Sequence, residues 1–341
     1  MSALPASTKP ILTNAAMRLQ LRAVRLEAEG ICSFELADPS GKELPPFEAG
    51  AHIDVYLSNS LVRPYSLAGD PHIRDRYLLG VLREPNSTGG SKTLHEQMRV
   101  GDMLSLGAVR QAFSLHTPPI GEKQHTVLLA AGIGITPIKA MAHTLATRGE
   151  SFELHYCAKS PMHAAFLSEL KKVVPADRLH LHFDGGNVSQ SLDIARLLDT
   201  QAANYQPNSH VYYCGPAGFM KACAAATQGW PSGTVHYEYF QAPTATGAAG
   251  HAPKQGEFEV HLQRTGITVQ VATDQTIIRA LELAGQRVPT SCLSGLCGAC
   301  KVNYFDGEVE HNDYILSDVE KTQCLTLCVS RAKSARLVID L

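Results

Sequence analysis

The sequence predicts a multidomain protein in which an antiparallel β-barrel, an α/β domain with a parallel sheet and a small α+β domain follow one another along the chain. Three observations predict this fold class. Apolar and polar residues alternate over the first hundred or so residues, strand and helix segments alternate after Glu122, and a loop with three cysteines runs from Cys292 to Cys300. The length of 341 residues suits two or three domains.

The first segment, residues 1–116, is expected to form the barrel. In residues 51–57, Ile53, Val55 and Leu57 alternate with polar side chains, which is the period of a half-buried strand. Other strand candidates, separated by turn signals, lie at residues 19–26, 31–36, 77–83 and 103–109. Short strands at this spacing favour a small antiparallel barrel.

The second segment, residues 122–240, is expected to form the α/β domain. Continuous apolar strand candidates alternate there with helical stretches, which predicts a parallel sheet covered on both faces. Residues 241–255, rich in alanine, glycine, proline and threonine, predict a flexible linker. Residues 256–341 predict a hairpin, a helix, the cysteine loop, a short strand, a helix opened by a capping box of Ser317 and Glu320, and a last strand.

The cysteine loop has the spacing C-x4-C-x2-C, and one more cysteine follows at a distance that suits a fourth ligand. This arrangement holds plant-type [2Fe–2S] clusters. The four candidate ligands are Cys292, Cys297, Cys300 and Cys328. Gly295 and Gly298 would let backbone N–H groups face the sulfurs. Structural zinc is the alternative, although its usual pattern is two close pairs. A thioredoxin-like C-x-x-C would leave two cysteines unexplained.

Residues 130–138, Ala-Ala-Gly-Ile-Gly-Ile-Thr-Pro-Ile, are expected to end a strand and begin a helix, with Thr136 as the N-cap. Such a helix start can bind a pyrophosphate, and Gly132 and Gly134 permit its close approach. Two glycines at a strand–helix turn also occur for packing alone. A second strand end, residues 213–219, should meet the same edge of the sheet, where ligands of open parallel sheets bind.

A nicotinamide gives up two electrons as hydride, whereas a [2Fe–2S] cluster takes one at a time, so a flavin is expected between them. Residues 61–70 offer a site for it. Arg63 can meet a phosphate or the ring edge, Tyr65 can pack beside the ring and Ser66 can hydrogen-bond a ring nitrogen. Residues 87–92, Ser-Thr-Gly-Gly-Ser-Lys, can seat a phosphate at a helix start. Taken singly, each feature also has an ordinary structural explanation.

The overall composition restricts the partners. A net charge of −2 offers no general attraction to nucleic acid or to an anionic membrane, so neither is expected as a partner. The longest apolar run, Val127–Ile135, is too short to cross a bilayer, and the N-terminus has no apolar core of a secretory signal. We therefore expect a cytoplasmic protein in which the nine cysteines are free or metal-bound.

Together, these motifs resemble the phthalate dioxygenase reductase family, which includes the vanillate demethylase reductases. The resemblance rests on Arg-Pro-Tyr-Ser-Leu, Gly-Gly-Ser, Ala-Gly-Ile-Gly-Ile-Thr-Pro, Tyr-Cys-Gly-Pro, His-Tyr-Glu-Tyr-Phe and the cysteine loop, in this order. It implies FMN, NADH and a [2Fe–2S] cluster in a β-grasp ferredoxin domain, with NADPH left open as an alternative to NADH. It also implies an oxidoreductase that passes electrons to a Rieske-type terminal oxygenase or demethylase acting on an aromatic compound. A cytochrome P450 or another hydroxylase is the alternative acceptor, and a zinc-stabilised binding protein the alternative class.

The resemblance also implies which residues hold each cofactor. FMN would be held by Arg63, Pro64, Tyr65, Ser66, Val81, Gly89, Gly90 and Ser91, with Glu238 and Phe240 at its border. The dinucleotide would be bound by Gly132 and Thr136, with Cys214, Gly215 and Pro216 beside the nicotinamide. Ser66, Cys214 and Glu238 are the candidate catalytic residues, and the four cysteines are the cluster ligands.

The chain departs from the family pattern at Thr88 and at residues 109–113, so the FMN phosphate is expected to be held differently. Lys159 is a candidate for contact with a 2′-phosphate. An acidic stretch near the cluster loop is expected to steer the electron acceptor. Its members are Asp306, Glu308, Glu310, Asp313, Asp318 and Glu320.

Overall fold

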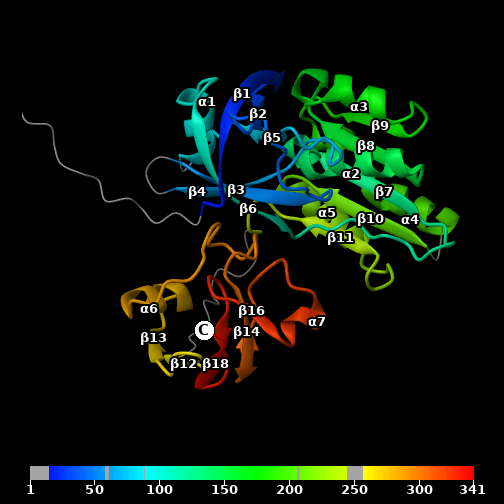
Figure 1. Ribbon diagram of the computed structural model, residues 1–341. Coiled ribbons are helices and arrows are strands. Elements are labelled where there is room, and N and C mark those ends of the chain that lie inside the picture. The colour runs from blue at the N-terminus through cyan, green and yellow to red at the C-terminus, as the bar shows by residue number, and fades with distance from the viewer. Residues whose placement is uncertain (1–14, 58–60, 86, 88, 206–207, 244–255) are drawn as a thin grey trace, which may run out of the picture.

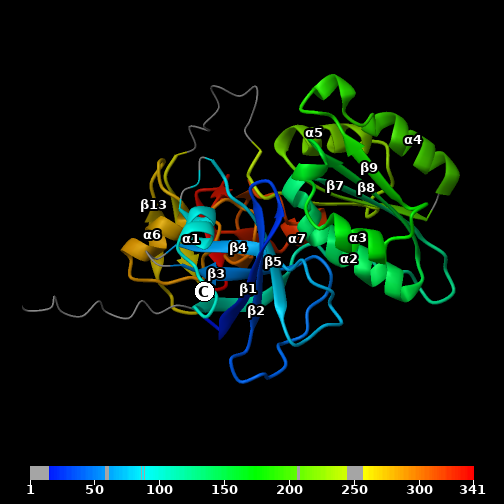
Figure 2. The ribbon, with the colours of Figure 1, turned by 90° about the horizontal axis from the view of Figure 1, so that it is seen from above.

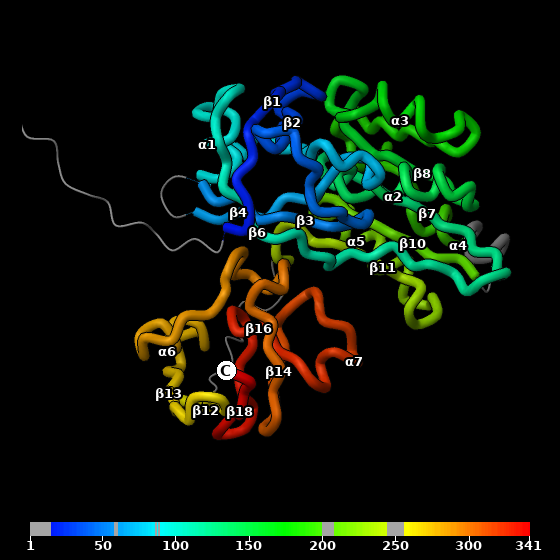
Figure 3. Tube along the Cα trace, in the orientation of Figure 1, coloured from blue at the N-terminus to red at the C-terminus, as the bar shows by residue number. Residues whose placement is uncertain are grey.

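The computed structural model describes residues 15–57, 61–85, 87, 89–205, 208–243 and 256–341. The barrel and the α/β domain lie side by side, and the third domain lies against the barrel below them (Figure 1). Figure 3 follows the chain from the blue barrel through the green α/β domain to the orange and red third domain. The multidomain fold class is confirmed, while the exact domain limits stay predictions. No helix among the described residues is both long and apolar enough to span a bilayer.

The first domain is an antiparallel sheet that closes on itself. Its strands are β1 (Met17–Ala28), β2 (Ile31–Ala37), β3 (Ala51–Tyr56), β4 (Val62–Ser66), β5 (Tyr77–Leu82) and β6 (Met103–Gln111), with helix α1 (Gly90–Glu96) between the last two. They are ordered β4-β3-β6-β1-β2-β5. A bridge between Leu67 and Leu79 joins the two outer strands, and the Ala68 N–H donates to the Leu78 carbonyl at 2.8 Å. The expected barrel is thus present.

Strand β3 is buried on both faces, so the expectation of a half-buried strand is wrong. Ile53 and Val55 lie in the barrel core, but His52 and Asp54, on the other face, are only 3% and 2% exposed. The third domain covers this outer face, because the Ser291 hydroxyl donates to the Asp54 carboxylate. A pattern of polar residues on one strand face does not distinguish a face that is covered by water from one that is covered by another domain.

The second domain is a five-stranded parallel sheet with the order β11-β10-β7-β8-β9. The strands are β7 (His125–Ala131), β8 (Ser151–Ala158), β9 (Leu179–Phe183), β10 (Ser209–Cys214) and β11 (Val235–Glu238). The helices are α2 (Ile135–Arg148), α3 (Leu167–Val173), α4 (Ile194–Tyr205) and α5 (Ala217–Ala226). Apolar residues of α2 and α3 pack on one face, and those of α4 and α5 on the other (Figure 2). The predicted two-sided parallel sheet is confirmed.

Short 3-10 turns add to this domain: η1 (Gly132–Gly134), η2 (Pro161–His163) and η3 (Val188–Gln190). Turn η1 shifts the start of α2, so the prediction of Thr136 as the N-cap is wrong. Gly134 is the N-cap, and the Thr136 hydroxyl donates to the Ile133 carbonyl at 3.0 Å. A Cβ on Gly134 would lie 2.2 Å from the Cys214 carbonyl oxygen. This glycine therefore lets α2 begin directly against the end of β10.

A buried lysine fastens the first domain to the second. Lys139, on α2, is fully buried; its ammonium group donates to the Ala68 carbonyl of the barrel at 2.6 Å and pairs with Glu169 at 2.7 Å. Burial lowers the pKa of Lys139, and the Glu169 carboxylate opposes this shift. Because an unpaired buried charge is costly, these partners fix the barrel against α2.

The third domain is α+β. Its elements are β12 (Phe258–Leu262), β13 (Thr268–Val271), α6 (Ile277–Leu283), β14 (Lys301–Asp306), β15 (Val309–Glu310), α7 (Asp318–Lys321), β16 (Cys324–Thr326), β17 (Arg331–Ala332) and β18 (Arg336–Ile339). Strands β12 and β13 form the predicted hairpin, and the capping box of Ser317 and Glu320 opens α7 as expected. Residues 244–255 of the predicted linker lie outside the described residues.

The close approach at Gly134 generates a stability prediction. We expect Gly134→Ala to lower the free energy of unfolding of the second domain by about 1–3 kcal/mol, because backbone must move to admit the methyl group. Thermal denaturation followed by circular dichroism measures this. Gly229→Ala is the matched control, since nothing lies within 4 Å of its added Cβ. Equal melting temperatures for the two variants would contradict the prediction.

Candidate functional site

A cavity of about 1590 Å³ opens where the three domains meet. Its volume exceeds that of a site for one drug-sized ligand, so it suits more than one cofactor. Most of the predicted site residues line it: Arg63, Pro64, Tyr65, Ser66, Val81, Gly90, Ser91, Gly132, Thr136, Gly215, Pro216, Glu238, Phe240, Cys292 and Cys297. The structure thus brings together residues predicted for three different cofactors.

The barrel wall of the cavity combines β4 with the start of α1. A Cβ on Gly90 would lie 2.6 Å from Cγ of Arg63, so the arginine packs directly on the helix start. Gly89 is the N-cap with φ 111°, a conformation that favours glycine. The Ser91 hydroxyl accepts from the Glu84 N–H at 3.2 Å. A guanidinium beside the N–H groups of a helix start fits a phosphate, whereas Thr88 lies outside the described residues.

Ser66 and Glu238 meet across the cavity from different domains. The Ser66 hydroxyl donates to the Glu238 carboxylate at 3.1 Å, although the two residues are 172 positions apart. Burial raises the pKa of Glu238 to about 7, and the bond from Ser66 opposes this rise. Burial also raises the pKa of Tyr65 to about 12, so its hydroxyl stays neutral. Glu238 is therefore a group that can change its charge near neutral pH beside the predicted flavin site.

The second wall is the carboxyl edge of the parallel sheet, between β7 and β10. These neighbouring strands lead to helices on opposite faces, so this is the switch point at which ligands of open sheets bind. Gly132, with φ 54°, follows β7, and Gly215 and Pro216 follow β10. This edge fits a dinucleotide.

Two further predicted residues, Cys214 and Lys159, do not line the cavity. Cys214 is fully buried at the end of β10, and burial raises its thiol pKa well above the ordinary value. Its carbonyl rather than its thiol contacts the glycine turn. Lys159 is exposed and lies beside Gly186. A catalytic role for Cys214 and a phosphate contact of Lys159 stay predictions.

The cysteine loop forms the third wall. Backbone N–H groups point at its sulfurs: those of Ser294 and Leu296 donate to Cys292 at 3.4 and 3.3 Å, and that of Gly295 donates to Cys328 at 3.3 Å. Gly295 and Gly298 have φ of 71° and 68°, so the backbone freedom expected of them is used. Such N–H groups stabilise thiolates and cluster sulfides.

The four sulfurs form two pairs rather than one tetrahedron. The thiol of Cys292 lies beside that of Cys297, and the thiol of Cys300 lies beside that of Cys328. Among the described residues, no three of these sulfurs lie within 4.8 Å of one another. One zinc ion with bonds of about 2.3 Å would hold its four sulfurs closer together than this. Two pairs fit two irons, and the pair that faces the cavity is Cys292 with Cys297.

The sequence motifs give no sign of the side chains that dock this loop on the barrel. Arg110 holds Asp54 through two hydrogen bonds of 2.5 and 2.7 Å, and the Ser291 hydroxyl donates to the same carboxylate at 2.5 Å. His52 accepts from Arg110 at 3.2 Å, and burial lowers its pKa to about 4, with Arg110 adding to the shift. Arg110 lies in the segment 109–113 that departs from the family pattern.

Comparison with protein families agrees with the cofactor types expected at the sheet edge and at the cysteine loop. The model for oxidoreductase NAD-binding domains matches residues 128–225, and the model for 2Fe–2S iron–sulfur cluster binding domains matches residues 260–333. The vanillate O-demethylase oxidoreductase of Pseudomonas sp. (strain HR199 / DSM 7063) is 44% identical over 94% of this chain and 98% of its own. The reductase subunit of tert-butanol monooxygenase / tert-amyl alcohol desaturase of Aquincola tertiaricarbonis is 45% identical over 96% of both chains.

The solved structure of phthalate dioxygenase reductase, described as modular for electron transfer from pyridine nucleotides to [2Fe–2S], is 38% identical. It covers 95% of this chain and 98% of its own, with a TM-score of 0.67. The chain belongs to the phthalate dioxygenase reductase family. A self-sufficient cytochrome P450 monooxygenase also matches, with 33% identity and a TM-score of 0.86 over 98% of this chain, but only 43% of that longer chain.

Membership of the phthalate dioxygenase reductase family makes this chain an oxidoreductase whose cofactors are FMN, a nicotinamide dinucleotide and a [2Fe–2S] cluster. The observed walls fit these groups: a helix start beside Arg63, a sheet edge at its switch point, and two pairs of cysteines. The individual assignments of residues to cofactors stay predictions.

The bond between Ser291 and Asp54 generates a kinetic prediction. A hydrogen bond to a charged group contributes about 1.5–3 kcal/mol, so Ser291→Ala should lower the equilibrium constant for docking of the loop about tenfold or more. We expect anaerobic stopped-flow spectroscopy to show slower cluster reduction by a similar factor, with flavin reduction by NADH unchanged.

Ser317→Ala is the matched control for Ser291→Ala, because it removes a serine hydroxyl of the same domain that caps α7 instead of contacting the barrel. It should leave both rates unchanged. A Ser291→Ala protein that reduces its cluster at the rate of the control would contradict a docking role for this bond.

Proposed function

We propose that this chain is the cytoplasmic reductase component of a two-component Rieske-type oxygenase or demethylase, to which it supplies single electrons from NADH. The observation that carries the proposal is the shared cavity, whose walls unite Arg63 of the barrel, Gly215 of the sheet edge and Cys292 of the cysteine loop. A flavin bound there supplies the step from hydride to single electrons. The chain itself aligns the donor, the ring and the cluster sulfurs.

The choice of acceptor rests on the relatives. One is named for vanillate O-demethylation and another for phthalate dioxygenation, both reactions on aromatic acids, which supports an aromatic substrate for the partner. The relative named for tert-butanol is the reductase subunit of an oxygenase that acts on an aliphatic alcohol, so an aliphatic substrate also occurs among the relatives. The match to the self-sufficient cytochrome P450 supports the alternative acceptor. In that protein, a similar set of domains is one part of a longer chain.

Acceptor reconstitution tests the proposed function. We expect the visible spectrum of the purified protein to show flavin and [2Fe–2S] bands that bleach with anaerobic NADH. The reduced protein should then reduce a Rieske-type oxygenase faster than a separate cytochrome P450. Faster delivery to the cytochrome P450 would favour the alternative, and a colourless protein inert toward NADH would refute both.

The salt dependence of the same reaction tests the acidic stretch. Its exposed members are Asp306, Glu308 and Asp318, whereas Asp313 is buried and accepts the Leu316 N–H at 2.8 Å. Only the exposed carboxylates can steer a partner, and salt screens such steering. We expect delivery to the oxygenase to slow at high ionic strength, while reduction by NADH within the same protein supplies the control rate.

The raised pKa of Glu238 generates a pH prediction. Its carboxyl group is neutral below about pH 7 and ionised above it. An ionised carboxylate would repel the negative charge that hydride transfer brings to the ring, so flavin reduction by NADH should slow as the pH rises through about 7. In Glu238→Gln this inflection should be absent.

Anaerobic stopped-flow measurements between about pH 6 and pH 8 follow this step. Glu308→Gln, a substitution of an exposed glutamate in the third domain, should keep the inflection of the unaltered protein. An inflection that persists in Glu238→Gln would assign the titration to another group.

A further inference from the structure

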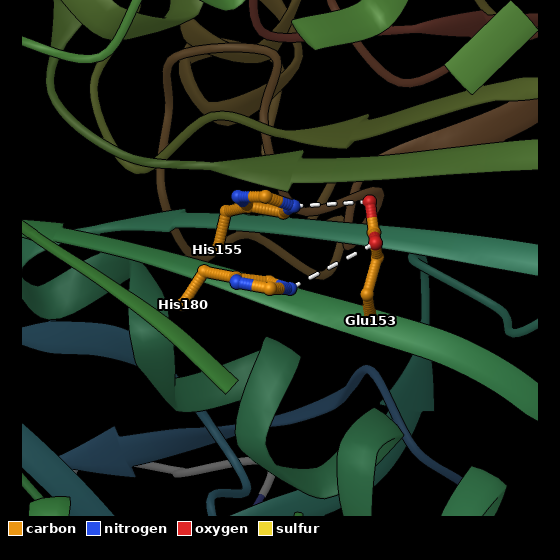
Figure 4. A group of neighbouring side chains, drawn as sticks. All are labelled: Glu153, His155 and His180. Atoms are coloured by element: carbon orange, nitrogen blue, oxygen red, sulfur yellow. Dashed lines mark hydrogen bonds and ion pairs between the residues drawn. The ribbon is translucent and has the colours of Figure 1, made fainter. Parts of the chain in front are cut away.

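Two neighbouring strands of the second domain carry a group of histidine and glutamate side chains, which are residue types that can ligate a metal ion. None of these residues belongs to the predicted cofactor sites. Glu153 and His155 lie two residues apart on β8, so both point to the same face of the sheet. In the parallel register His155 pairs with His180 of β9. Figure 4 shows the two imidazole rings one above the other, both facing the carboxylate.

The three side chains already converge. Nε2 of His155 lies 3.0 Å from one carboxylate oxygen of Glu153, and Nε2 of His180 lies 3.9 Å from the other. The rings stack with their centroids 4.5 Å apart at an angle of 21°. One ligand atom from each residue lies within 4.8 Å of the other two. A metal ion placed among them would require the two stacked imidazole rings to turn until both Nε2 lone pairs point at it.

A fourth residue orients the buried imidazole from behind. Nδ1 of His155 lies 3.0 Å from Nε2 of His182, so a hydrogen bond holds the ring with Nε2 toward Glu153. Metal-ligating histidines commonly have such a bond at their second nitrogen. The side chain of His155 is 7% exposed, whereas that of His180 is 39% exposed. One imidazole of the group is therefore buried, and the other faces solvent.

We propose that Glu153, His155 and His180 bind one divalent transition-metal ion of the zinc class, separate from the iron of the cluster. Two imidazoles and one carboxylate form a donor set that zinc accepts, with a fourth position open to water. Strand β9 is the edge strand of the sheet and is joined to β8. The bound ion would therefore clamp the edge strand and stabilise the folded domain.

Zinc binding to the holoprotein tests the site, with Zn²⁺ itself as the probe. After dialysis against a chelator, we expect isothermal titration to show one Zn²⁺ ion per chain and the melting temperature to rise. X-ray absorption at the zinc edge, which does not see iron, should show two imidazoles and an oxygen shell. His180→Gln and Glu153→Gln should each weaken binding more than tenfold.

The chain offers a matched control in a second group of stacked imidazoles, His116, His210 and His236, whose ligand atoms do not all lie within 4.8 Å of one another in the described part of the chain. His116→Gln removes an exposed member and should leave zinc binding unchanged. The visible spectra of flavin and cluster report that each variant is folded. Absence of stoichiometric binding, or equal binding by His180→Gln and His116→Gln, would overturn the proposal.

Discussion

The arrangement of the redox cavity depends on one buried carboxylate, Asp54, shared by two domains. Arg110 neutralises it from the neighbouring barrel strand. Ser291, which lies 237 positions after Asp54 in the chain, donates a hydrogen bond to it. A buried carboxylate with one partner missing is costly, so the barrel face and the cysteine loop stabilise each other. Because Ser291 directly precedes Cys292, this contact also sets which sulfur pair faces the cavity. The loop that carries the predicted cluster ligands Cys292 and Cys297 is therefore positioned by an interaction that is itself not redox-active.

The features that sequence patterns predicted are those determined by short stretches of chain. The existence of strand β3, the apolar strands between helices and the capping box of Ser317 each depend on neighbours a few residues away. The cysteine spacing is equally local, because the loop from Cys292 to Cys300 must wrap its own ligands. Such signals do not depend on how the domains are arranged. The elements that they predict are therefore also present in the folded chain.

The features that sequence patterns missed are set by contacts between distant parts. Asp54 and His52 look like solvent-facing residues of a barrel strand until another domain covers them. Lys139 occupies an ordinary helix position, and its burial is explained by the barrel carbonyl of Ala68 together with the Glu169 carboxylate of α3. The pairing of His155 with His180 needs the register of two strands separated by a helix. Thr136 differs in kind, since a local 3-10 turn displaced the helix start by a small shift that propensities do not resolve.

The division of the cysteines into two pairs gives the third domain two functional sides. Cys292 and Cys297 line the cavity shared with the barrel and the sheet edge, so that side faces the predicted flavin and nicotinamide sites. An acceptor must then approach a different surface of the same small domain. Helix α7 lies on the side of this domain opposite α6 (Figure 1), and its residues Asp318 and the apolar Val319 are both exposed. Exposed charge around an apolar residue suits a contact that must form and dissociate in each cycle, because charge speeds encounter while a small apolar area limits its lifetime.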